Sequence, residues 1–288
     1  MTIVAIWYQE ECETHPIWAC SDSRISDAKD NDSTGGGPLP LLQHGPKIFP
    51  LPIKSIDHTS PSNEIAFQHT VGLAYAGSSL FALNLYAALT PILTNLRGRA
   101  GAKVSIRSVA ELARQFLREF FRVYGERHGN VSRINIALFG FCKAEGVRRV
   151  FVLEPSIEPA SLGPSIDAKI TEVDYTAPEH VFLMGDHVAE IRAGIVETRA
   201  ARPNGSFFRH NAPRDVIRGV IKEGRYAGIG GAVQLAQANM HGLHQYMDLE
   251  RSQDGGFPTD FRYLGFELES FGNVGECWFC LPAVMPRT

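Results

Sequence analysis

A threonine follows the initiating methionine directly, and its chemistry depends on whether Met1 is removed. A threonine hydroxyl is a weak nucleophile until a nearby base accepts its proton. The α-amine of an N-terminal threonine can supply that base, because it titrates at about 7.7–8.0 in model peptides. While Met1 is attached, the same nitrogen is an amide and cannot act as a base. Thr2 is therefore a candidate N-terminal nucleophile, although strand propensity alone also explains a threonine at this position.

Two other groups of side chains could do chemistry, and each has a structural explanation. Asp186 and His187 could act as an acid/base pair, but a helix N-cap beside an exposed histidine is the commoner arrangement. His241 and His244 share one face only if their segment is helical, and it follows a strand-like run. We expect neither a metal ion nor an organic cofactor.

The overall composition restricts the class of protein. The 288 residues are 44% hydrophobic and 20% charged, which is ordinary for a globular chain. No internal repeat or linker is visible, so we expect a single domain over residues 1–288. A net charge of −3 provides no basic surface for nucleic acid or an anionic membrane. The sequence shows no apolar run of membrane-spanning length and no signal peptide at its N-terminus.

The cysteines indicate a reducing compartment. Their number, five, is odd, and they are scattered along the chain, which does not fit a disulfide scaffold. A cytoplasmic location is the simplest expectation. Cys277 and Cys280 form a C-x-x-C pair without a second pair to complete a zinc site. Their surroundings are apolar, and we expect core or strand packing, with a redox or metal role as the less favoured alternative.

The elements that must position Thr2 begin with strands. Residues 2–8 are β-branched and aromatic, and a polar turn separates them from a second short strand at 17–20, which predicts a hairpin. Residues 27–46, rich in Asp, Ser, Gly and Pro around Gly35–Gly37, are expected to form a loop. Extended segments follow at 47–51, 65–67 and 71–77.

Helical and extended segments then alternate in blocks. Apolar spacing predicts a helix over 78–96, with Pro91 inside it, and Ser108-Val109-Ala110-Glu111 resembles a capping box that opens a helix to about Tyr124. Further segments are expected as a hairpin at 131–141 and 147–153, a strand at 181–184, helices at 187–200 and 213–226, and extended chain at 232–238 and 263–281. This order suggests an α+β fold with helices outside two sheets.

Six short motifs follow one another along the chain: Thr2-Ile3-Val4-Ala5-Ile6, Ala19-Cys20-Ser21-Asp22-Ser23-Arg24, Lys47-Ile48-Phe49-Pro50, Gly72-Leu73-Ala74-Tyr75-Ala76-Gly77-Ser78, Met184-Gly185-Asp186 and Gly230-Gly231-Ala232-Val233. In this order they resemble the proteasome β-subunit superfamily of N-terminal nucleophile (Ntn) hydrolases, including the simpler bacterial ring peptidases. The resemblance covers most of the chain. It implies a four-layer αββα sandwich whose subunits assemble into stacked rings.

The resemblance also implies a role for individual residues. Lys47 would lie beside the Thr2 hydroxyl, where its charge disfavours protonation of the amine and lowers the pKa of the hydroxyl. Asp22 would pair with Lys47 and orient it. The amide of Gly77 would serve as the oxyanion-hole donor. Ser26 would bind substrate backbone as an added strand, and Tyr75 would form the floor of a short first specificity pocket.

The sequence departs from the family pattern near the nucleophile. Asp186 stands where a serine commonly follows the glycine, and a carboxylate close to the α-amine favours its protonated form. Tyr226 and Ile229 fall where the family has an aspartate and a serine before Gly230-Gly231. Asp186 and Tyr226 are therefore candidate accessory residues.

Two classes of function follow from these residues. The first is a threonine peptidase that hydrolyses peptides or unfolded proteins inside a homo-oligomeric ring, alone or beside a separate ATP-driven unfoldase. The second is a catalytically inactive ring or scaffold subunit, which the departures at Asp186, Tyr226 and Ile229 suggest. An amidase of the same superfamily acting on a small amide is a third option. No nucleic-acid or membrane partner is expected.

Overall fold

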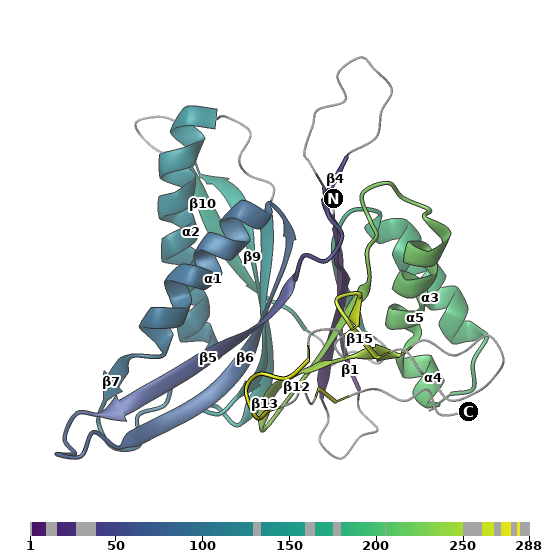
Figure 1. The fold of residues 1–288 in the computed structure, drawn as a ribbon. Helices are drawn as coiled ribbons and strands as arrows, with labels where there is room; N and C mark the ends of the chain where they lie inside the picture. The colour runs from purple at the N-terminus through teal and green to yellow at the C-terminus, as the bar shows by residue number, and fades with distance from the viewer. Residues whose placement is uncertain are drawn as a thin grey trace.

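The computed structural model describes residues 2–9, 16–26, 39–128, 134–158, 165–174, 180–204, 206–249, 261–267, 272–277 and 281–282. Within these ranges the chain is a mixed α/β structure with two large sheets and two small ones. In Figure 1 the large sheets lie in the middle of the molecule, with helices outside each of them.

The first large sheet contains the N-terminal strand. Its five strands lie in the order β11-β1-β2-β12-β13, and all neighbours are antiparallel. The predicted hairpin of the first two strands is confirmed, because β1 pairs with β2. The bounds of these strands are β1 Ile3–Tyr8, β2 Ile17–Asp22, β11 Val181–Gly185, β12 Val233–Asn239 and β13 Gly242–Tyr246.

The second large sheet contains six strands in the order β10-β9-β8-β6-β5-β7. All of its pairs are antiparallel except β5 with β7. The expected hairpin formed by β8 and β9 is confirmed. Its strands span β5 Ile48–Asp57, β6 Ile65–Gly77, β7 Leu96–Gly98, β8 Ile134–Cys142, β9 Val147–Glu158 and β10 Ser165–Glu172.

Short strands make up the two small sheets. β3 (Ile25–Ser26) pairs with β4 (Pro40–Leu42), so the end of the expected 27–46 loop is a strand instead. The Gly and Pro content of that segment hid the apolar residues of β4, and Gly35–Gly37 lie outside the described residues. The third sheet combines β14 (Asp248–Leu249), β15 (Phe261–Tyr263) and β16 (Phe266–Glu267).

Five helices complete the described structure: α1 Ser79–Leu93, α2 Ile106–His128, α3 Val188–Ala200, α4 Phe207–His210 and α5 Ala212–Glu223. The predicted helices are confirmed to within a few residues. Helix α2 begins at Ile106, two residues before the predicted start at Ser108, because Ser105 rather than Ser108 precedes its first turn. The Ser105 hydroxyl accepts a hydrogen bond from the Ser108 amide at 3.0 Å.

Alternation along β1 explains why the first strand is buried on both faces. Successive side chains of a strand point to opposite sides of its sheet. Ile3 and Trp7 pack among residues of α3 and α5, whereas Val4 and Ile6 pack against residues of the second large sheet. Because each face meets apolar neighbours, the strand is a continuous apolar run instead of an alternating one.

Small side chains line the contact between the two large sheets. Ala19 of β2, Ala74 and Ala76 of β6, and Ala137 of β8 belong to the same buried cluster. Alanine occupies little volume, so these positions allow the backbones of the two sheets to approach each other closely. The end of β2 and the start of β5 lie in this region.

The outer face of the second sheet is covered by α1 and α2 (Figure 1). The buried residues of α2 recur at helical spacing on one face; they are Ile106, Val109, Ala110, Ala113, Leu117 and Phe121. In α1, by contrast, Leu80 and Leu83 are exposed although they belong to the expected apolar series. None of the helices in the described ranges combines the length and apolar character needed to cross a bilayer.

Candidate active site

Thr2 lies immediately before β1 and is buried, with 3% of its surface exposed. Asp186, just after β11, holds it from two sides. The Thr2 backbone nitrogen donates to Asp186 Oδ2 at 3.0 Å, and the Asp186 amide donates to the Thr2 carbonyl at 2.8 Å. Both bonds use the backbone of residue 2, so its side chain takes no part in them.

Gly185 makes this close approach possible. Its φ of 114° lies in a region that side chains with a Cβ rarely adopt. A Cβ at this position would lie 1.9 Å from the Thr2 carbonyl oxygen, which is far inside van der Waals contact. The Gly185-Asp186 step therefore requires glycine at its first position in order to bring the carboxylate to Thr2.

Asp22 ends β2 and is fully buried. Each of its oxygens accepts two hydrogen bonds. Oδ1 accepts from the Ile3 amide at 3.1 Å and from Lys47 Nζ at 2.8 Å, and Oδ2 accepts from the Gly230 amide at 3.1 Å and the Arg24 amide at 3.3 Å. Both oxygens of this buried carboxylate therefore have hydrogen-bond donors. Asp22 thus links β1, the Lys47 side chain and the Gly230 turn.

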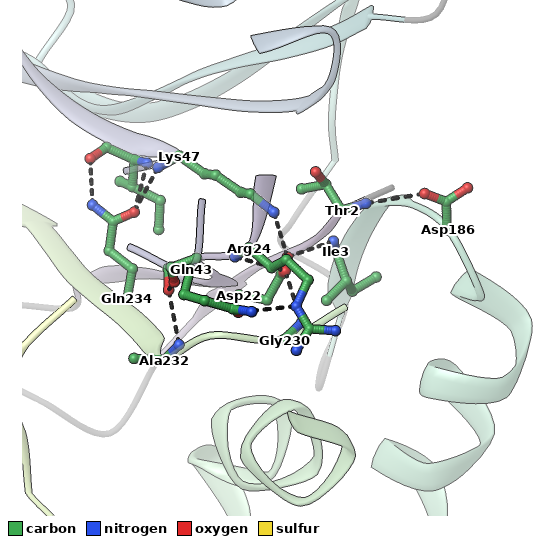
Figure 2. Close-up of polar contacts among 12 residues, drawn as sticks. Thr2, Ile3, Asp22, Arg24, Gln43, Lys47, Asp186, Gly230, Ala232 and Gln234 are labelled. Atoms are coloured by element: carbon green, nitrogen blue, oxygen red, sulfur yellow. Dashed lines mark hydrogen bonds and ion pairs between the residues drawn. The ribbon is translucent and has the colours of Figure 1, made fainter. Parts of the chain in front are cut away.

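Lys47 precedes β5 and contributes the positive partner from the second sheet. Its side chain is 1% exposed and forms an ion pair with Asp22. Burial lowers the pKa of Lys47, while the charge of Asp22 and its hydrogen bond act in the opposite direction. Figure 2 shows the lysine side chain extended from its strand toward Asp22 and Thr2. The predicted pairing of Asp22 with Lys47 is present, and it is adjacent to Thr2 through the Ile3 amide.

Gln234 of β12 supports Lys47, and the sequence reasoning missed it. Its side-chain oxygen accepts from the amides of Lys47 and Ile48 at 2.8 and 2.9 Å, and its nitrogen donates to the Ile48 carbonyl at 2.7 Å. Gln234 is 1% exposed. A glutamine directly after Gly230-Gly231-Ala232-Val233, at the start of a largely apolar strand, is the sequence signal that could have identified it. It fixes the backbone from which the lysine extends.

The turn at Gly230 and Gly231 packs against the end of β2. The Gly230 carbonyl accepts from the amides of Ser23 and Arg24 at 3.1 and 2.9 Å. Ser23 Oγ donates to the Gln43 carbonyl at 2.6 Å and accepts from the Ala232 amide at 2.8 Å. These contacts hold the segment that carries Asp22 in one position.

Tyr75 and Gly77 lie on β6, which contacts both β1 and β11. The Tyr75 amide donates to the Lys47 carbonyl at 3.1 Å, so this strand is joined to the lysine segment. The Tyr75 ring is buried and stacks on Phe49, and within the described part of the chain its hydroxyl has no hydrogen-bond partner. Burial raises the pKa of that hydroxyl, with a smaller contribution from Asp22. Gly77, exposed and with a φ of 107°, ends the strand before α1.

Ser26, the proposed substrate-binding residue, belongs to β3. Its hydroxyl is buried and has no hydrogen-bond partner among the residues that the structure describes. Strand β3 follows directly on the segment that contains Asp22 and Arg24, so Ser26 lies on the same stretch of chain as the ion pair.

Tyr226 and Ile229, which stand where the family has an aspartate and a serine, make other contacts. Tyr226 stacks on His187 with ring centroids 3.7 Å apart and planes inclined by 10°. Ile229 is fully buried in the core beside α3 and α5. His187 is the N-cap of α3 in a left-handed conformation, with a φ of 56°. The expected cap at Asp186 is therefore wrong, because the carboxylate of that residue contacts Thr2 instead.

The remaining sequence candidates do not gather near Thr2. His241 lies in the turn between β12 and β13, and His244 lies on β13, so the two do not share a helical face. Cys277 is exposed, which contradicts the expectation of core packing, and Cys280 lies outside the described residues. Across the described ranges, no cluster of three or more His, Cys, Asp or Glu side chains could hold a metal ion.

The arrangement brings a buried ion pair to the first residues of the chain. A fixed ammonium near a hydroxyl lowers the cost of forming an alkoxide, and a fixed carboxylate keeps that ammonium in place. Asp186 adds a negative charge at the nitrogen of the same residue. These groups could therefore alter both the acidity of the Thr2 hydroxyl and the basicity of its amine.

Comparison with known proteins supports the fold. No protein-family model matches the chain, and no curated protein matches it. Among solved structures, Anbu (ancestral beta-subunit) from Yersinia bercovieri is similar, with a TM-score of 0.50 and 15% sequence identity over 94% of each chain. The likeness at this low identity concerns the fold, which is proteasome-β-like.

Proposed function

We propose that this chain is a threonine-type peptidase in which Thr2, freed by removal of Met1, is the N-terminal nucleophile. The observation that carries the proposal is the buried Asp22–Lys47 pair, whose shared oxygen also binds the amide of the residue after Thr2. Burying two charges is costly unless their geometry and hydrogen bonding are good. A role in activating Thr2 therefore explains the buried pair more directly than a role in fold stability does.

The proposed reaction begins at the Thr2 hydroxyl. The free α-amine accepts its proton while the oxygen attacks the scissile carbonyl, and Lys47 stabilises the negative charge on the hydroxyl oxygen. The Gly77 amide is the proposed donor to the oxyanion. Collapse breaks the peptide bond, the leaving amine takes the proton, and an acyl ester remains on Thr2. Water activated by the same α-amine then hydrolyses that ester.

Substrate binding is assigned to Ser26 and Tyr75. A peptide lying beside β3 would pair with its backbone as an added strand. The unpartnered Ser26 hydroxyl supports this assignment, because a buried hydroxyl without a partner is costly and a bound backbone could supply one. Tyr75 is joined to Lys47 through its backbone amide, and a ring of this size at the floor of the first specificity pocket would favour small side chains.

The proposed architecture is a single four-layer αββα domain over residues 1–288. Three buried clusters support it: one joins α1 and α2 to the second sheet, one joins the two large sheets, and one joins the first sheet to α3 and α5. We also propose that subunits form homo-oligomeric stacked rings in the cytoplasm, with any ATP-driven unfoldase as a separate chain.

The second candidate function is an inactive ring or scaffold subunit. The contact of Asp186 with the Thr2 nitrogen favours it, because a carboxylate at this distance stabilises an ammonium and so opposes its use as a base. The apolar Ile229 and the stacked Tyr226 add no polar support near the nucleophile. A small-amide amidase would use the same nucleophile on a different substrate.

Intact mass and covalent labelling test the proposal. Protein from its native host is weighed to establish loss of Met1, and is then treated with an epoxyketone that reacts with both the hydroxyl and the free amine of an N-terminal threonine. We expect one adduct on Thr2, retained in Thr2→Ser and absent in Thr2→Ala. Native mass spectrometry of both variants checks that assembly is unchanged.

The outcomes separate the candidates. Retained Met1, or a free Thr2 that forms no adduct in an intact assembly, would exclude the peptidase and favour the scaffold. An adduct combined with cleavage of small amides, but not of a short-peptide library, would favour the amidase.

A further inference from the structure

The Gly185-Asp186 step places a carboxylate where the α-amine of processed Thr2 must lie. The 3.0 Å contact of Asp186 Oδ2 with the Thr2 nitrogen is accompanied by the bond from the Asp186 amide to the Thr2 carbonyl. Since the second bond fixes the backbone of Asp186 against residue 2, the carboxylate has little freedom to move away. Removal of Met1 would change the nitrogen from an amide donor to an ammonium donor without moving either partner.

We propose that Asp186 is a positioning residue that binds the α-ammonium of processed Thr2 and delays its conversion to the free base until alkaline pH. The inference rests on the proposed function, because it needs a free N-terminal threonine. It goes further in two ways. Processed Thr2 gains a fixed ionic partner, and the pKa of its α-amine is expected to rise.

Charged and titratable groups surround the amine from several elements. Asp186 and His187 lie at the junction of β11 and α3, and Asp22 and Arg24 at the end of β2. Lys47 lies at the start of β5; the other two titratable neighbours are Tyr75 on β6 and Tyr226 after α5. Asp22 is already neutralised by Lys47 and backbone donors. Asp186 contacts the amine nitrogen directly, at 3.0 Å.

The start of α3 favours a negative charge on Asp186. The helix begins at Val188, and its unpaired amides give its N-terminus a partial positive charge. His187 is occupied by its stack on Tyr226, and its Nδ1 lies 3.7 Å from Glu190. These contacts leave the Asp186 carboxylate directed at Thr2, as Figure 2 shows.

The expected consequence is an upward shift in the titration of the amine. An opposite charge in direct contact typically moves a pKa by about one to three units in favour of the charged form. The positive charge of Lys47 lowers the pKa of the same amine, so the midpoint of the amine titration reflects both charges. The difference between the native protein and a variant without the carboxylate isolates the effect of Asp186.

Trace acetylation measures this titration without depending on peptidase activity. Full-length assembled protein that has lost Met1 is treated briefly with acetic anhydride between acidic and alkaline pH, and hydroxylamine then removes any ester formed on the hydroxyl. Mass spectrometry of the N-terminal peptide gives the N-acetylation rate, which follows the unprotonated fraction. Burial of Thr2 scales this rate but leaves its midpoint unchanged.

The variants are Asp186→Asn, which keeps the shape and removes the charge, Asp186→Ser and Asp186→Glu. Glu190→Gln is the matched control, because it removes a carboxylate from the first turn of the same helix. We expect Asp186→Asn and Asp186→Ser to lower the midpoint by about one unit or more and to raise the acetylation rate at neutral pH roughly tenfold. Glu190→Gln should leave the midpoint unchanged, and Asp186→Glu should restore part of the shift.

The results distinguish this inference from the proposed function. Coincident midpoints for native protein and Asp186→Asn, on chains that have lost Met1, would overturn the inference while leaving the epoxyketone test of Thr2 intact. Retained Met1 would overturn both. If the amine shift is found but no substrate is cleaved at any pH, the inference stands and the peptidase proposal fails. In an active enzyme, the acidic limb of kcat/KM should move with the amine midpoint.

Discussion

Replacement of either member of the Asp22–Lys47 pair should destabilise the fold, and the two replacements should differ in a defined order. In Lys47→Met the carboxylate loses its ammonium but keeps three backbone donors, from Ile3, Arg24 and Gly230. Breaking a buried pair from one side typically costs about 3–5 kcal/mol, and the remaining donors place this variant near the lower value.

Asp22→Ala removes more. The amides of Ile3 and Gly230 lose their acceptor, whereas the Arg24 amide keeps the Gly230 carbonyl. Each buried donor left without a partner costs about 1–3 kcal/mol, in addition to the unpaired ammonium of Lys47. The total is on the order of 5–8 kcal/mol, comparable with the whole stability of many domains. The double variant Asp22→Ala/Lys47→Met should be more stable than Asp22→Ala alone, because it removes the unpaired charge.

Thermal unfolding followed by circular dichroism, at one fixed protein concentration, provides the assay. For chains of this size about 1 kcal/mol shifts Tm by roughly 2–4 °C, so Lys47→Met should lose about 6–12 °C. Gln68→Met, on an exposed position of β6, serves as the surface control. If the double variant unfolds at a lower temperature than Asp22→Ala, or if Asp22→Ala unfolds at the native temperature, the assigned roles of the pair are wrong.

Two further predictions concern stability. Gly185→Ala should lower the unfolding free energy by about 2–5 kcal/mol, because it adds backbone strain and overlap with the Thr2 carbonyl. Gly146→Ala is the control, since Gly146 has a φ of 72° but open space around it, and it should cost about 1 kcal/mol in the same urea titration. Equal losses for the two variants would contradict the close approach of Gly185 to Thr2. Burial, together with the charge of Lys143, lowers the pKa of His69 in the folded chain, so the unfolded chain binds the proton first and stability should fall as pH drops below about 6.5. His69→Gln should reduce that loss between neutral and acidic pH, and an unchanged pH slope would show that the histidine does not contribute.

The positions of the long helices were predictable to within a few residues, because apolar spacing is a local property of the sequence. The same reasoning failed at Pro40–Leu42, where a short strand pairs with β3 across a long intervening segment. It also failed at Leu80 and Leu83, since α1 is apolar on most of its faces and periodicity cannot choose the buried one.

For the candidate site, motif order predicted the pairing of Asp22 with Lys47, but not what surrounds the pair. Asp22 and Lys47 are paired as the resemblance implies. The acceptor bonds of Asp22 to Gly230 and of Gln234 to the Lys47 amide join segments far apart in the chain, and no local signal specifies them. The proximity of Asp186 to Thr2 was anticipated, whereas the left-handed His187 and its stack on Tyr226 follow from packing around α3.

The backbone clamp on residue 2 has a consequence for protein chemistry. Its nitrogen and carbonyl are bound by Asp186, and the next amide is bound by Asp22, so all three contacts use backbone atoms of residues 2 and 3. None of the three depends on which side chain residue 2 carries. A chain that begins with cysteine instead would present an amine and a thiol on adjacent carbons at a fixed position, ready for selective condensation with an aldehyde. The same clamp would then act as a conjugation site for attaching probes to the protein.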